Sequence, residues 1–204
     1  MINRVLIRLK LIQIVYAYYQ NGNKNLDAGE KELFFSLSKA YDLYNYLLML
    51  MVAVNRFAQR RIDAAKAKLA PTPEELNPNT KFADNQFIAQ LEVNKQLAEY
   101  ANNQKRSWND EEDFVKSLYE KIVASDIYKE YMASEESSYD ADRELWRKLY
   151  KTFVFNNEEL DSLLEDQSLY WNDDKDIVDT FVLKTIKRFD PQNGANQELL
   201  PEFK

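Results

Sequence analysis

The chain of 204 residues has no cysteine and no histidine, and it has only three glycines and five prolines. The absence of cysteine excludes disulfide bridges and thiol nucleophiles. The absence of histidine removes the commonest proton-transfer group and a usual ligand of metal ions. A disulfide-stapled secreted fold is therefore excluded. We expect a cytoplasmic protein without a cofactor, a metal site or a catalytic centre.

Long apolar runs are also scarce. The longest, Tyr46 to Val54, falls well short of the roughly 20 residues that a membrane span requires. The amino-terminal segment mixes basic and apolar residues in a helical period, whereas a signal peptide divides them into separate regions. No membrane partner and no signal peptide are expected.

The scarcity of glycine and proline predicts an all-α protein, because sheets need turn residues far more often. Apolar residues at three- and four-residue spacing predict a helical bundle that forms one unit over residues 1–204. The prolines Pro71 and Pro73 end a long second helix and open a polar connection. The expected helices are 2–19, 30–69, 84–100, 109–123, 125–132, 140–155, 158–164 and 174–189.

The first helix carries Arg4, Arg8 and Lys10 and contains no acid. Cations near a helix N-terminus oppose the macrodipole, so this small cationic patch needs an outside partner or another reason. One alternative is that the long basic side chains only extend to solvent from a buried helix. The apolar positions are expected to pack along the length of the helix; they are Ile2, Val5, Leu6, Leu9, Ile12, Val15, Tyr16 and Tyr19.

A secondary basic patch is predicted late in the second helix, where Arg56, Arg60 and Arg61 are followed by Lys66 and Lys68. Arg56 and Arg60 share a face at four-residue spacing. The alternative is a solvated helix face, since basic residues are good helix formers without any partner.

Charge is divided unevenly along the chain. Residues 1–109 have a net charge of +5, residues 110–180 have a net charge of −13, and the whole chain has −7. Such a division predicts one surface that tolerates polyanions and another that attracts a basic protein. The alternative is that the acids only coat the solvent faces of the later helices.

The opening helix runs from Arg4-Val-Leu-Ile-Arg8 to Leu11-Ile-Gln13-Ile-Val-Tyr16. It resembles the first helix of the NusB family of transcription antitermination factors, in which an arginine-rich start leads to a Gln-x-Leu-Tyr pattern. Val178-Asp179 followed by Val182-Leu183-Lys184 is similar to a later NusB helix, and Trp146 to Leu164 resembles the elements before it. The family's run of arginines is reduced here to Arg4, and its Arg-Glu pair is Arg8-Leu9.

The resemblance implies a NusB-like bundle with a long-helix insertion. Residues 25–135 are then divergent or inserted helices, residues 136–190 are NusB-like helices, and the chain is the amino-terminal portion of a long variant. The implied function is binding of boxA-like RNA together with NusE, a ribosomal protein, during ribosomal RNA transcription. Arg4, Arg8 and Lys10 would contact RNA phosphates.

Two other function classes stay open. A non-catalytic interaction scaffold that uses its acidic helical face predicts that Arg4 and Arg8 can be lost without consequence. A carboxylate enzyme or metal site at Asp173, Asp174 and Asp176 is the other alternative. The absence of the glycine and distal glutamate of a calcium loop argues against it. The tyrosines Tyr41, Tyr44 and Tyr46 are expected to pack in and around the core, and a base-stacking platform is the alternative.

Overall fold

The computed structural model describes residues 4–22 and 25–200, and every regular element within these ranges is helical, which confirms the all-α class. The expected helix start at Ile2 lies outside the described residues. The elements are α1 (Arg4–Asn21), α2 (Leu26–Lys66), α3 (Pro73–Leu76), α4 (Gln86–Glu92), α5 (Lys95–Asn103), η1 (Trp108–Glu111), α6 (Glu112–Ala124), α7 (Asp126–Ala133), α8 (Tyr139–Leu149), η2 (Tyr150–Val154), α9 (Glu158–Gln167), η3 (Asn172–Asp174) and α10 (Lys175–Arg188).

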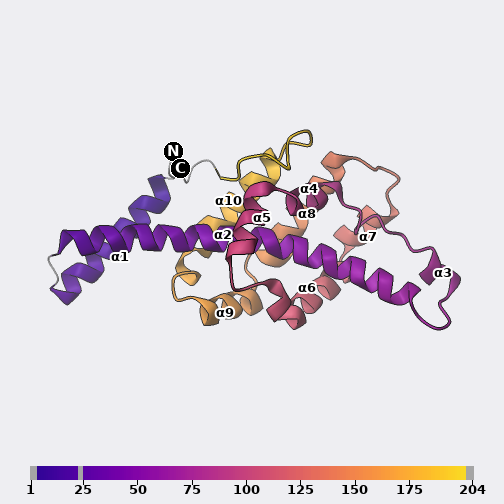
Figure 1. The fold of residues 1–204 in the computed structure, drawn as a ribbon, viewed down its shortest axis with the longest axis horizontal. Helices are drawn as coiled ribbons and strands as arrows, with labels where there is room; N and C mark the ends of the chain where they lie inside the picture. Colours follow the sequence, from indigo (N-terminus) through magenta and orange to yellow (C-terminus); the bar gives the residue numbers. More distant parts are fainter. Residues whose placement is uncertain (1–3, 23–24, 201–204) are drawn as a thin grey trace.

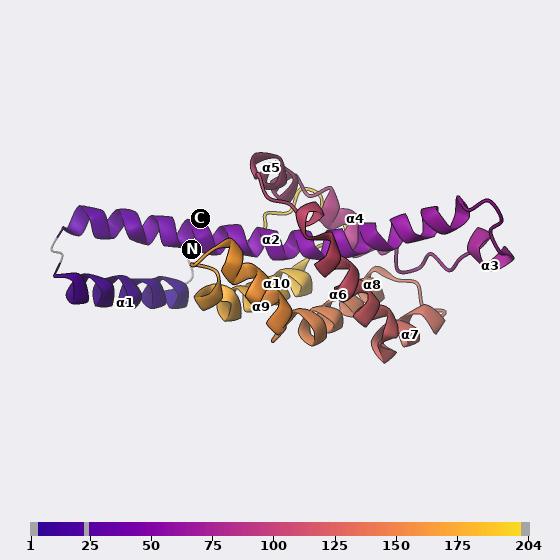
Figure 2. The same cartoon turned by 90° about the horizontal axis from the view of Figure 1, so that it is seen from below.

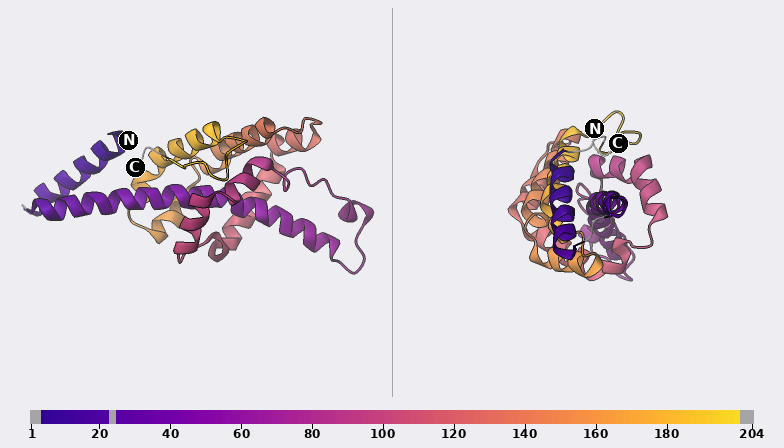
Figure 3. Two further views of the ribbon diagram at one scale, coloured as in Figure 1. Left: turned by 45° about the horizontal axis from the view of Figure 1, so that its top comes forward. Right: turned by 90° about the vertical axis from the view of Figure 1, so that its left-hand side faces the viewer.

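The 41-residue helix α2 is the axis of the molecule. It contacts α1, α4, α6 and α10, and the view along it shows other helices arranged around it (Figure 3). The side chain of Asn25 caps its start by accepting a hydrogen bond from the backbone N–H of Ala28 at 3.2 Å. Tyr44 and Tyr46 are buried in the core, as predicted. The buried apolar residues form one cluster around this helix.

Helix α1 runs antiparallel to the first part of α2, and the two form a hairpin that projects from the rest of the molecule (Figure 1). The short helix α3 lies at the opposite end of α2 (Figure 2). The helices from α4 to α10 gather around the middle of α2. The hairpin therefore has few neighbours, which leaves one side of α1 open to solvent.

The predicted helix 84–100 is two helices, α4 and α5, which meet at Asn94. The Asn94 side chain caps α5 by accepting from the N–H of Leu97, and it donates to the carbonyl oxygens of Gly194 and Gln197 at 2.8 and 2.9 Å. This fully buried asparagine ties the segment after α10 to the α4–α5 corner. The cap on α5 is local, whereas the other two bonds join Asn94 to residues about a hundred positions later, and apolar periodicity reveals neither.

The predicted helix 140–155 ends differently from the expectation. Regular α-helix stops at Leu149, and one wider π turn follows, in which the N–H of Phe155 donates to the carbonyl of Tyr150 at 3.1 Å. The carbonyl of Val154 at the end of this turn accepts a hydrogen bond from the Lys175 ammonium of α10 at 2.9 Å. A side chain from another helix thus satisfies a backbone group that the helix end leaves unpaired.

Candidate nucleic-acid interface

Helix α1 is held against the rest of the molecule through the face that carries Leu6 and Lys10. Both side chains are buried, with exposed fractions of 0% and 2%. The Lys10 ammonium lies 2.5 Å from Oδ1 of Asp174, a fully buried acid that directly precedes α10. Burial raises the pKa of Asp174, and the charge of Lys10 opposes this rise. Apolar packing and a buried ion pair together fix the position of α1.

The prediction that Lys10 contacts an external phosphate is wrong. Its side chain points into the protein and neutralises Asp174. Breaking a buried ion pair leaves a charge without compensation away from water, which is strongly unfavourable. Lys10 is therefore not available to a ligand. The expected site is reduced to Arg4 and Arg8.

Arg4 and Arg8 are exposed, and neither forms an ion pair with any described residue. Five large apolar or aromatic residues share their side of the helix, each with 60% to 85% of its surface exposed. At 3.6 residues per turn, these seven positions fall within roughly a third of the helix circumference. We call this surface the α1 outer face; it consists of Arg4, Val5, Arg8, Ile12, Val15, Tyr16 and Tyr19.

The expectation that the apolar positions of α1 pack along its length is therefore wrong for most of them. Leu6 is buried and Leu9 is half-buried, whereas the five apolar members of the α1 outer face lie in solvent. The physical reason is that apolar residues occur all around α1, while its main neighbour, α2, covers only one side. Exposed apolar residues gathered on one face are typical of an interaction site.

The α1 outer face combines two kinds of groups that single-stranded RNA needs. The guanidinium groups of Arg4 and Arg8 are available for phosphates, and the rings of Tyr16 and Tyr19 are available for stacking with bases. The Tyr16 hydroxyl accepts a hydrogen bond from the Gln20 side chain at 2.9 Å, which orients its ring. This arrangement supports binding and requires no bond-breaking step.

The secondary basic patch is largely neutralised in the fold. Arg56 pairs with Glu92 at 2.6 Å, and Arg60 pairs with Glu112 at 3.2 Å. Arg61 is exposed and has no ion pair within the described residues. The structure therefore favours the interpretation of this segment as a solvated helix face over a phosphate-binding surface.

The three neighbouring acids near the start of α10 do not point to a common centre. Asp174 is buried against Lys10, whereas Asp173 and Asp176 are exposed. Within residues 4–22 and 25–200, no group of three or more acids is placed so that it could hold a metal ion.

Two groups of polar residues were missed by the sequence analysis. One is the buried pair Lys175 and Asp179 in α10, whose four-residue spacing was a usable signal. The other is the adjacent pair Lys105 and Arg106 in the connection after α5. Two consecutive cations in a short polar loop are visible in the sequence, but their neighbours across the fold are not.

Comparison of the chain with protein-family models, with curated proteins and with solved structures gave no match. No helix within the described part of the chain combines the length and the apolar character needed to cross a bilayer.

Proposed function

We propose that this chain is an RNA-binding transcription antitermination factor that acts on ribosomal RNA transcription together with NusE. The resemblance of the opening helix to the NusB family supports this proposal. The observation that carries it is the exposure of Arg4 and Arg8, without carboxylate partners among the described residues, on the face that presents Tyr16 and Tyr19. A factor of this kind is cytoplasmic and not an enzyme.

The arginines and the tyrosines of the α1 outer face contact different parts of the RNA in this proposal. The two arginines supply affinity through phosphates, a contribution that weakens with salt and carries no sequence information. Selection of a boxA-like segment then requires contacts to unstacked bases, for which Tyr16 and Tyr19 are the exposed rings on this face. A protein partner can cover the remaining apolar residues Val5, Ile12 and Val15.

Loss of both arginines is expected to weaken RNA binding. The double variant Arg4→Ala, Arg8→Ala should bind a boxA-like single-stranded RNA at least about tenfold more weakly, because charge-assisted hydrogen bonds to phosphate are lost. The slope of log affinity against log salt should fall by about two. Fluorescence anisotropy of labelled RNA across a salt series measures both quantities.

The matched control is the double variant Lys116→Ala, Lys129→Ala, which removes the same charge from exposed sites on α6 and α7. It should keep most of the affinity. Equal losses in the two double variants would reduce the effect to net charge and contradict a site on α1. An unchanged affinity in the Arg4, Arg8 variant would contradict a site on α1. No RNA binding by the unchanged protein would favour the non-catalytic interaction scaffold that uses the acidic helical face.

The proposed NusE surface is the acidic part of the chain, residues 110–180. Most of its acids are exposed, including Glu165 and Asp166 at the end of α9, whereas Asp142, Asp174 and Asp179 are buried. Exposed acids steer a basic protein during diffusion and raise its association rate more than its final affinity.

The association rate with NusE should therefore fall on the order of tenfold between roughly 0.05 and 0.5 M salt. The variant Glu165→Lys, Asp166→Lys should associate several-fold more slowly at low salt. Stopped-flow measurements compare it with Glu30→Lys, Glu99→Lys, which makes the same charge change at exposed sites in α2 and α5. A rate that does not depend on salt would contradict the acidic surface.

A further inference from the structure

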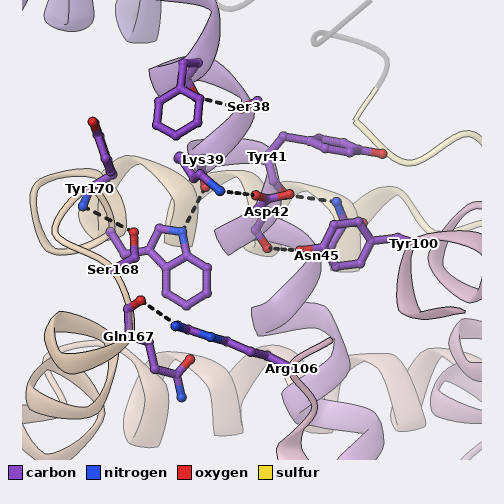
Figure 4. A network of polar contacts seen from close by, with 12 residues as sticks. Ser38, Lys39, Tyr41, Asp42, Asn45, Tyr100, Arg106, Gln167, Ser168 and Tyr170 are labelled. Carbon is purple, nitrogen blue, oxygen red and sulfur yellow. Dashed lines mark hydrogen bonds and ion pairs between the residues drawn. The ribbon is translucent and has the colours of Figure 1, made fainter. Parts of the chain in front are cut away.

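A second polar region lies between α2, α5 and the segment that follows α9. Here a cleft of about 330 Å³ is lined by charged, amide and aromatic side chains of these parts, of the connection after α5 and of the last residue of α9. Figure 4 shows Lys39 and Asp42 of α2 and Tyr100 of α5 near Arg106 and Gln167. We call it the Trp171 cleft; the residues used below are Lys39, Tyr46, Tyr100, Lys105, Arg106, Gln167 and Trp171.

The cations of the Trp171 cleft exceed its acids. Lys39 pairs with Asp42 at 3.3 Å. Lys105 and Arg106 are exposed and have no ion pair within the described residues, although Nη1 of Arg106 donates to the carbonyl of Gln167 at 2.5 Å. That hydrogen bond fixes the guanidinium at the mouth of the cleft and leaves its other donors free. The cleft therefore offers a localised positive charge to an anion.

Aromatic side chains form the wall beneath these cations. The Tyr46 ring is stacked against Trp108 and Trp171, with centroid distances of 4.1 and 5.3 Å. The indole N–H of Trp171 donates to the carbonyl of Lys39 at 3.0 Å, which fixes the ring. Burial raises the pKa of Tyr46 to about 12, so that its hydroxyl stays protonated at neutral pH. Stacking and the indole hydrogen bond therefore hold the rings of Tyr46 and Trp171 in place.

One buried polar atom of the cleft, Oε1 of Gln167, has no hydrogen-bond partner among the residues that the structure describes. The Nε2 group of Gln167 donates to the Tyr46 hydroxyl at 3.2 Å and to Glu111 at 2.9 Å, and these bonds fix the orientation of the amide. Its Oε1 is buried and accepts no hydrogen bond from the described residues. A buried acceptor without a donor costs free energy, which a ligand N–H or O–H can recover.

We propose that the Trp171 cleft binds a nucleoside phosphate, with Lys105 and Arg106 on the phosphate, the base beside Trp171 and Tyr100, and Gln167 Oε1 accepting from the base or ribose. A simple anion uses only the cations, and an apolar ligand uses only the rings. A nucleoside phosphate uses the cations, the rings and the free amide acceptor together. This proposal is independent of the proposed function, because Arg4 and Arg8 take no part in the cleft.

The test is a titration of the full chain with adenosine and uridine monophosphates, followed by tryptophan fluorescence. Inorganic phosphate is the anion control. Either nucleotide should bind at least tenfold more tightly than phosphate, and Lys105→Ala should weaken nucleotide binding at least tenfold. Lys105 is exposed and makes no ion pair in the described chain, so this variant is expected to fold. Arg106→Lys keeps the positive charge but not the forked arrangement of N–H donors, so its loss of nucleotide affinity should be intermediate.

The control variant Lys95→Ala removes an exposed cation from α5 outside the cleft and should bind as the unchanged protein does. A single-stranded hexanucleotide distinguishes the two sources of the ligand. Tighter binding than the mononucleotide, lost in Lys105→Ala, assigns the site to a nucleotide within RNA, whereas equal binding assigns it to a free nucleotide.

Three results would overturn the proposal: no nucleotide binding, equal binding of inorganic phosphate, or equal binding by Lys105→Ala and the unchanged protein. The variant Arg4→Ala, Arg8→Ala separates the two proposals. It should retain mononucleotide binding in the cleft even if boxA-like RNA binding on α1 is lost or was never present.

Discussion

Replacement of Lys10 by methionine is expected to lower the free energy of unfolding by about 3–5 kcal/mol, because it leaves the Asp174 carboxylate buried without its countercharge. The Asp174 side chain is fully buried, and no other donor to its carboxylate is found among the described residues. Methionine has a similar length and flexibility, so packing changes little. Urea unfolding followed by circular dichroism measures the change.

The double variant Lys10→Met, Asp174→Leu tests whether the unpaired charge of Asp174 causes the loss of stability. Removal of both charges also removes the desolvation cost, so this variant should recover most of the stability that the single variant loses. Lys31→Met changes an exposed lysine in the same hairpin and should shift stability by less than about 0.5 kcal/mol. A loss of less than about 1 kcal/mol in Lys10→Met would mean that water reaches Asp174 and that the pair is not a buried one.

The same pair determines how α1 presents its outer face. Leu6 and Lys10 are the two buried residues of this helix, and Lys10 pairs with Asp174, so the loss of Lys10 weakens the contact between α1 and the start of α10. Hydrogen exchange should accelerate in α1 more than in α6, because local opening of the hairpin costs less than global unfolding. RNA affinity should fall too if the α1 outer face is the binding surface.

Most helices could be predicted from the sequence because their limits are encoded locally. The predicted helix 30–69 corresponds to α2, and Pro71 lies shortly after its end. Ser125 caps α7 by accepting from the N–H of Tyr128, as its position before an amphipathic run indicates. Periodicity, caps and prolines act within a few residues, so the ends of these helices can be predicted from the nearby sequence.

The orientation of α1 could not be predicted in the same way. A helix with apolar residues on all sides has no unique buried face, and only its neighbours decide which residues are covered. Lys10 was assigned to the surface by residue type, but the buried acid that it neutralises lies more than 160 residues later in the chain. The structure therefore agrees with the predicted exposure of Arg4 and Arg8 and differs from the predicted exposure of Lys10, while RNA binding by this helix stays a prediction.

Removal of one partner of the second buried ion pair, between Lys175 and Asp179, is the other change with a large expected effect on stability. The Lys175 ammonium donates to Oδ2 of Asp179 at 2.8 Å, and the Tyr150 hydroxyl donates to Oδ1 at 2.6 Å. Asp179 is fully buried and Lys175 is 4% exposed. Lys175→Met should lower the free energy of unfolding by about 3–5 kcal/mol at pH 7, since the carboxylate keeps only the Tyr150 hydroxyl and the carbonyl of Val154 loses its donor.

This loss should depend on pH, and the direction follows from the pKa of Asp179. Burial raises that pKa above the ordinary value of 3.8, and Lys175 opposes the rise. Removal of Lys175 raises the pKa further, so the folded variant binds a proton that the unfolded chain has already released. The free energy of unfolding of the variant should then fall as the pH rises from about 4 towards the raised pKa. Its deficit relative to the unchanged protein should be smaller at pH 4 than at pH 7.

Urea unfolding at both pH values measures the deficit, with Lys187→Met as the exposed control on α10 and Lys175→Met, Asp179→Leu as the variant without either charge. The double variant should lose most of the pH dependence, because the buried Asp179 is gone and only Asp161, whose Oδ1 lies 3.5 Å from the Lys175 ammonium, remains of the acids that pair with Lys175. A deficit that is equal at pH 4 and pH 7 would contradict Asp179 as its source. It would assign the effect of Lys175 to the hydrogen bond with Val154, whose carbonyl does not titrate.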